Sequence, residues 1–144
     1  MKGLVVMNVF RSVGDAGGRI CCICLLLLAA VGCFAGTPGE RIRQLKGTVV
    51  DKGNGVIDLD LSNTELTDDD CGYVHAYCAN EGYTTINTLN LSNTAITDEF
   101  LNEMALQQDF ASGVRELILV GTKTSDAAVK KYQAVNPGCR IVRQ

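Results

Sequence analysis

The sequence is poor in the residue types on which several functional classes depend. It has no tryptophan, 6% aromatic residues and a single histidine, His75, in 144 residues. Without residues 1–33 it keeps 15 acidic and 10 basic residues, a net charge near −5. Because phosphate contacts need clustered Lys and Arg, this composition argues against nucleic acid as the main partner. With one histidine, no serine nucleophile motif and no convergent carboxylate pair, the sequence also predicts neither enzyme activity nor a cofactor.

The seven cysteines do not form an even disulfide framework. Four lie at positions 21, 22, 24 and 33, which leaves Cys71, Cys78 and Cys139 in the body of the chain. Three thiols cannot all pair within one chain. Cys71 and Cys78 would lie about 10 Å apart along a helix, beyond the reach of a disulfide. We therefore predict that all three are small, buried side chains.

The N-terminal segment has the features of an export signal. Basic residues precede an apolar run over residues 20–31, about 12 residues long, which suits a signal-peptide core and is short for a membrane-spanning helix. The sequence Ala30-Val-Gly-Cys33 resembles a bacterial lipobox, although Ala30 stands where Leu is usual. The resemblance implies a signal peptide over residues 1–33, lipid attachment at Cys33, and an exported protein anchored to the membrane of the cell envelope.

Alternatives to lipid attachment stay open. Cleavage after Ala35 would release a secreted protein, the segment could be retained uncleaved, and the true start could be Met7. After a signal peptide over residues 1–33, residues 34–46, which include Thr37-Pro-Gly39, are expected to form a tether.

A ten-residue string occurs three times in the body of the chain. Leu59-Asp-Leu-Ser-Asn-Thr-Glu-Leu-Thr-Asp68 nearly coincides with Leu89-Asn-Leu-Ser-Asn-Thr-Ala-Ile-Thr-Asp98, and Leu117-Ile-Leu-Val-Gly-Thr-Lys-Thr-Ser-Asp126 is a weaker copy. We call these strings the first, second and third LxL segments. They begin 30 and 28 residues apart, which is the period of a strand-plus-helix repeat.

The pattern L-x-L-x-x-T-x-[LI]-[TS]-D resembles the leucine-rich-repeat family, in the short bacterial variety with Thr where the better-known consensus has Asn. The resemblance implies an α/β solenoid over residues 47–142, with parallel strands on the concave side and helices on the convex side. Residues 47–50 and 56–57, around a Gly- and Asn-rich turn, predict a hairpin cap at its start. A final short strand is expected over residues 139–142, after Pro137-Gly138.

The residues of the LxL segments make physical sense without the resemblance. Alternation predicts that Val56, Leu59 and Leu61 point to the core and that Asp58, Asp60 and Ser62 point away from it. Each segment ends in a hydroxyl residue followed by Asp, a helix-start signal that predicts helices over 68–81, 98–111 and 126–135. Gly82 and Gly113 are the expected stops, and Thr64, Thr94 and Thr122 are expected to bond loop backbone groups.

The outward strand positions predict rows of residues on the concave face. We expect the rows Asp58, Thr88, Glu116; Asp60, Asn90, Ile118, Arg140; and Ser62, Ser92, Val120. This face should grade from acidic to polar to apolar, with Ile118 and Val120 beside Arg140 as the contact centre for a protein partner of unknown identity. The alternative interpretation is an ordinary solvated sheet, in a structural or accessory envelope lipoprotein without a dedicated partner.

A metal site is a further alternative. Cys71, His75 and Cys78 would lie on one face of a helix, and two thiolates with an imidazole can ligate zinc. However, Cys71 occupies the position of the core residue Leu101, and no fourth ligand is evident nearby. We therefore predict no metal site.

Overall fold

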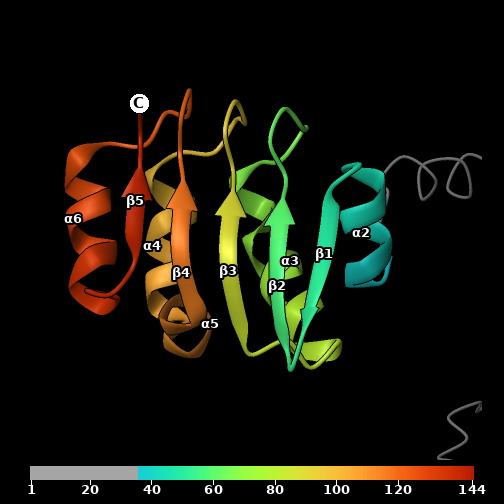
Figure 1. The fold of residues 1–144 in the computed structure, drawn as a ribbon. Coiled ribbons are helices and arrows are strands. Elements are labelled where there is room, and N and C mark those ends of the chain that lie inside the picture. The colour runs from blue at the N-terminus through green and yellow to red at the C-terminus, as the bar shows by residue number, and fades with distance from the viewer. Residues whose placement is uncertain (1–35) are drawn as a thin grey trace, which may run out of the picture. The chain divides into compact units, whose positions relative to one another are not determined.

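A five-stranded sheet forms the centre of the fold, with the strands in the order β1-β2-β3-β4-β5 (Figure 1). The structure is a computed structural model and describes residues 36–144. β1 pairs antiparallel with β2, and β2, β3, β4 and β5 pair parallel in turn. The strands are β1 (Thr48–Gly53), β2 (Val56–Asp60), β3 (Thr85–Asn90), β4 (Val114–Ile118) and β5 (Arg140–Val142). The α/β class, the N-terminal hairpin and the final short strand are thus confirmed.

The helices leave one face of this sheet uncovered within residues 36–144. α3, α4 and α5 lie behind the sheet in Figure 1, α2 lies beside β1, and α6 lies beside β5. We call the uncovered side the open face. The helical elements are α2 (Pro38–Gln44), the 3-10 turn η1 (Asp68–Asp70), α3 (Cys71–Asn80), α4 (Asp98–Leu106), α5 (Gln108–Gly113) and α6 (Asp126–Val135).

The core lies between the sheet and the helices. Each LxL segment contributes two leucines that are at most 2% exposed. A fully buried leucine stabilises a fold by about 1.5–3 kcal/mol, so these six side chains are a major part of the driving force. One inward residue differs from expectation: Ile57 is fully buried, whereas Val56 is only half-buried. Alternation from Leu59 places Ile57 inward, and the prediction for Val56 was wrong. The leucines are Leu59, Leu61, Leu89, Leu91, Leu117 and Leu119.

The LxL segments are joined by equivalent hydrogen bonds. The backbone N–H and the hydroxyl of Thr97 both donate to Asp68, each at 2.8 Å. Ser125 donates in the same way to Asp98, at 2.6 and 2.7 Å. The helix-start carboxylates therefore bridge to the following segment, a role beyond the favourable interaction with the helix end that the sequence predicts. As predicted, one threonine of each LxL segment donates a hydroxyl hydrogen bond to a loop carbonyl three residues before it. The donors are Thr64, Thr94 and Thr122, and the acceptors are the carbonyls of Leu61, Leu91 and Leu119, respectively.

The predicted tether is wrong for most of its length. Residues 38–44 form α2, which begins with a capping box between Thr37 and Glu40. Ile42 and Leu45 are 2% and 5% exposed and belong to the core. Because burial of two aliphatic side chains stabilises a docked helix, this segment is part of the fold.

The helix expected over residues 98–111 is interrupted. α4 ends at Leu106, and Gln107 takes a backbone conformation outside the helical region (φ −90°, ψ 73°) before α5 begins. The break allows Phe110 and Ala111 of α5 to be buried. The carbonyl of Ala111 accepts hydrogen bonds from the Tyr132 hydroxyl (3.2 Å) and the Asn136 side-chain amide (2.5 Å). Contacts with the following unit of chain thus outweigh continuation of the helix.

Candidate binding surface

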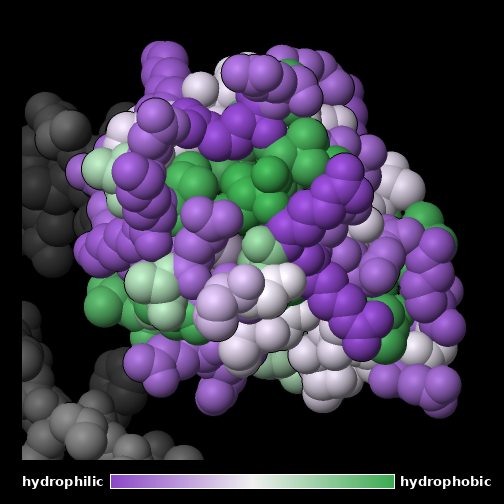
Figure 2. All heavy atoms as spheres, turned by 60° about the vertical axis from the view of Figure 1, so that its left-hand side comes forward, coloured by the Kyte–Doolittle hydropathy of each residue, from purple (hydrophilic) through white to green (hydrophobic). Residues whose placement is uncertain are grey.

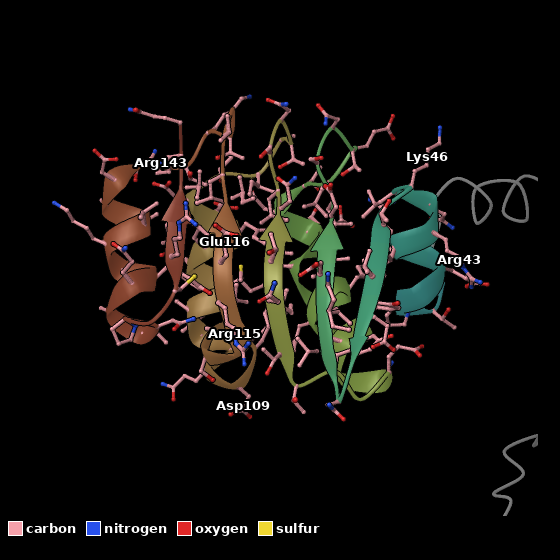
Figure 3. All side chains as sticks on the ribbon, viewed as in Figure 1. Arg43, Lys46, Asp109, Arg115, Glu116 and Arg143 are labelled. Atoms are coloured by element: carbon pink, nitrogen blue, oxygen red, sulfur yellow. The ribbon has the colours of Figure 1, made fainter. Side chains whose placement is uncertain are left out.

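The predicted binding residues lie on or beside the open face, in rows set by the strand register. In the lower row, Asp58 pairs with Thr88, Thr88 with Glu116, and Glu116 with Arg140. In the upper row, Asp60 pairs with Asn90, Asn90 with Ile118, and Ile118 with Val142. Figure 3 labels Glu116 at the middle of β4, on the side facing the viewer.

Two details of the predicted rows are corrected by this register. The predicted row that puts Arg140 beside Ile118 is wrong, because Arg140 pairs with Glu116 and Val142 pairs with Ile118. The final strand is therefore shifted by two residues from its expected pairing with β4. β3 also contains an irregularity, since Ile57 pairs with Ile86 while Asp58 pairs with Thr88. Asn87 is the extra residue of this β-bulge.

The lower row is a continuous polar network. Lys52 forms an ion pair with Asp58 (2.7 Å), and the side-chain amide of Asn87 donates to the same carboxylate (2.9 Å). On β4, Glu116 accepts from the Thr88 hydroxyl at 3.5 Å and pairs with Arg140 at 3.1 Å. Hydrogen bonds from Lys52 and Asn87 lower the pKa of the Asp58 carboxyl below its ordinary value. The negative charges of Asp58 and Glu116 are thus balanced by the positive charges of Lys52 and Arg140. This row is therefore not the acidic surface that the sequence predicts.

The upper row keeps the predicted gradient. Asp60 is exposed and its carboxylate accepts the backbone N–H of Ser62 at 2.9 Å. Asn90 accepts from both the N–H and the hydroxyl of Ser92. Ile118 and Val142 follow, both half-buried. Across four strands spaced about 4.8 Å apart, the surface therefore changes from a carboxylate through an amide to two branched aliphatic side chains.

The third row follows the strands at the upper edge of the open face. Ser62, Ser92 and Val120 occupy equivalent places, because Asn63 N–H donates to the Ser92 carbonyl and Asn93 N–H donates to the Val120 carbonyl. Val120 is half-buried like Ile118. The apolar end of the open face thus consists of Ile118, Val120 and Val142, rather than Ile118 and Val120 beside Arg140.

Three residues of the surface were missed by the sequence analysis. Lys52 lies in the hairpin that was assigned only to a cap, Asn87 lies at the bulge, and Val142 was displaced by the register error. The alternation of β1 carried the signal for Lys52, since it lies an even number of residues from Thr48 and Val50. Nothing in the local sequence of β3 indicates the bulge.

The geometry gives no support to the alternative zinc site. Cys71 and Cys78 are 0% and 3% exposed, as predicted for core residues, and the His75 ring lies 5.2 Å from the ring of Phe110. Burial raises the pKa of each of these two thiols to about 12. Among residues 36–144, no group of three or more His, Cys, Asp or Glu side chains could hold a metal ion. Cys71 instead donates a weak hydrogen bond to the carbonyl of Phe100 at 3.7 Å.

Comparison with known proteins does not assign this chain to a family. Protein-family models, curated proteins and solved structures give no match. The predicted signal peptide over residues 1–33 and the lipidation site at Cys33 lie outside the described residues. Within residues 36–144, none of the helices has the length and apolar character needed to cross a bilayer.

Proposed function

We propose that this chain is an exported, lipid-anchored leucine-rich-repeat protein that binds another protein through the open face of its sheet. The observation that carries the proposal is the uncovered face of a mostly parallel sheet. Parallel sheets in globular proteins are normally covered by helices on both faces, whereas repeat proteins use an uncovered strand face for binding. Within residues 36–144 of this chain, helices cover only one of the two faces of the sheet.

The upper row supplies the chemistry for a protein contact. The exposed carboxylate of Asp60 offers a site for a basic side chain, and the aliphatic groups of Ile118, Val120 and Val142 offer a site for an apolar one. Protein interfaces combine an apolar centre with a polar rim in this way. The row spans only a few strands, so the partner surface that it fits is small.

The test is capture of partners from intact membranes by the wild-type protein and by Ile118→Asp. Leu106→Asp is the matched control, because Leu106 is an 81% exposed aliphatic residue of α4, away from the open face. We expect Ile118→Asp to lose the captured neighbours and Leu106→Asp to retain them, with both variants folded by circular dichroism. Equal recovery by all three proteins contradicts the proposal and favours an accessory lipoprotein without a dedicated partner.

The anchor has a separate test. Cys33→Ser removes the sulfur that would carry the lipid, so we expect the protein to move from the membrane fraction to the soluble fraction. Cys139→Ser is the control for loss of a thiol, since Cys139 is buried in the described part of the chain. An unchanged distribution of Cys33→Ser shows that the lipobox interpretation is wrong.

A further inference from the structure

The two ends of the sheet are finished differently. At the β1 end, α2 places Ile42 and Leu45 against the core. At the β5 end, α6 lies beside the last strand, and within the described residues no further element follows Val142. A shallow hollow of about 530 Å³ remains there, lined by Val129 and Gln133 of α6 and by residues 140–144. Figure 2 shows this side of the molecule, with apolar surface gathered in a depression and hydrophilic residues around it.

The hollow includes the free edge of a strand. β5 is the last strand in the sheet order, so its outer backbone N–H and C=O groups face no further strand within residues 36–144. Ile141 pairs with buried Leu117 and points to the helix side, where Val129 lies. Arg140 and Val142 pair with residues of the open face and point the other way. The edge therefore has an apolar side and a side that carries a guanidinium.

Charge is distributed unevenly along the chain. Residues 36–120 carry 14 acidic and 5 basic side chains, whereas residues 121–144 carry 1 acidic and 5 basic ones. The unit formed by α6 and β5 is thus the basic end of an acidic protein. Arg140 pairs with Glu116, but 77% of its side chain is exposed, so its guanidinium can also contact a ligand. A ligand at this edge is attracted when it is acidic.

We propose that the outer edge of β5 is a second binding site, which accepts an extended acidic segment of a partner protein as a sixth strand. In this arrangement the backbone of the segment bonds the free edge of β5, as in other cases of strand addition. Alternate side chains of an added strand face opposite sides of the sheet. Acidic residues of the segment face Arg140, and aliphatic residues face Ile141 and Val129. This site goes beyond the open face and does not depend on it.

A second copy of the chain fits this edge less well. Pairing of β5 with the β5 of another copy brings the two basic units together, so the interaction is opposed by like charges. Within one chain Asp126 already pairs with Arg143, and Glu116 already pairs with Arg140. Neither carboxylate is therefore free to offset the repulsion between the two basic units.

The probe is a synthetic capped peptide of alternating glutamate and valine, labelled with a fluorophore, and its binding is measured by anisotropy. Two control peptides test its two features: one carries lysine in place of glutamate, and one carries N-methyl groups on the edge-facing amides. Arg140→Glu is the test variant. Arg43→Glu is the matched control, because Arg43 is exposed on α2 at the opposite end of the sheet (Figure 3).

We expect the acidic peptide to bind with a Kd at or below about 1 mM. Arg140→Glu should weaken binding about tenfold, and Arg43→Glu should not. Both control peptides should fail to bind, and the Ile141 amide, which faces the outer edge because Arg140 and Val142 bond toward β4, should exchange more slowly in the complex. Binding that survives N-methylation, or that Arg140→Glu leaves unchanged, overturns the proposal. So does a dimer that buries β5 in the free protein, or binding to anionic lipid vesicles without binding to the peptide.

Discussion

The ion pair between Arg41 and Asp70 is the sharpest test of the finding that α2 belongs to the fold. Arg41 Nε and Nη2 donate to the two Asp70 oxygens at 2.6 and 3.0 Å, and the Asp70 side chain is 3% exposed. Removing one partner of a buried ion pair costs about 3–5 kcal/mol. In Arg41→Met, Asp70 keeps the hydrogen bond from the Thr67 N–H, and 31% of the Arg41 side chain was already exposed. We therefore expect a loss of about 2–3 kcal/mol.

The assay is urea unfolding of Arg41→Met and of Arg43→Met, followed by circular dichroism. Arg43→Met is the control, since it makes the same change two residues away on the exposed side of α2. We expect Arg43→Met to change the free energy of unfolding by less than about 0.5 kcal/mol, as surface substitutions generally do. Equal effects of the two substitutions refute the reasoning. So does an unchanged urea midpoint in both variants, which is the result expected if residues 38–44 were a tether.

The pH dependence of this difference gives an independent check. Burial by itself raises the pKa of Asp70, but hydrogen bonds from Arg41 and Thr67 outweigh it and hold the pKa below its ordinary value. The stabilisation is therefore present above the ordinary carboxyl pKa and is lost as the pH falls through the lowered, folded-state pKa. In Arg41→Met, the hydrogen bonds from Arg41 no longer offset the effect of burial on the Asp70 pKa, so Asp70 takes up a proton at a higher pH than in the wild type. The gap between wild type and variant should thus be smaller at about pH 4 than at pH 7.

Three further predictions follow from the joints between the LxL segments and from the core. Hydrogen bonds from Ser125 lower the pKa of Asp98, so Asp98→Asn should lower the melting temperature at neutral pH and have less effect as the pH falls through that pKa. Gly121→Ala should lower the free energy of unfolding by about 1–3 kcal/mol, because Gly121 has φ +71° and an added Cβ would lie 2.2 Å from Asn93 Oδ1. In a double-mutant cycle, the additional substitution Asn93→Gly should recover part of this loss, because it removes the clashing oxygen. Burial raises the pKa values of three thiols to about 11 or 12, so these thiols should react with a thiol reagent at pH 8 only after unfolding. Modification at these three positions in the native protein, located by peptide mapping, contradicts their burial. They are Cys71, Cys78 and Cys139.

The local sequence determined those features that depend on neighbours in the chain. Alternation in Leu59-Asp-Leu61 decides which side chains can be buried on one face of a strand, and the hydroxyl residue before Asp98 decides where a helix can begin. The hairpin before Val56 and the last strand could be predicted for the same reason, since turn residues act over a few positions. The burial of Cys71 also followed from a local comparison, because it is equivalent to Leu101.

The tertiary structure decided everything that depends on contacts between distant residues. The ion pair between Arg41 and Asp70 helps hold α2 against the rest of the fold. The hydrogen bonds to the Ala111 carbonyl favour the break between α4 and α5 at Gln107. Neither contact leaves a signal in the sequence around it. The same holds for the candidate binding surface, where Lys52 and Arg140 neutralise carboxylates on other strands. The sequence gives the sign of each charged side chain and its position along the chain. Which opposite charge it pairs with depends on the strand register, and the register is set only by the packing of the sheet.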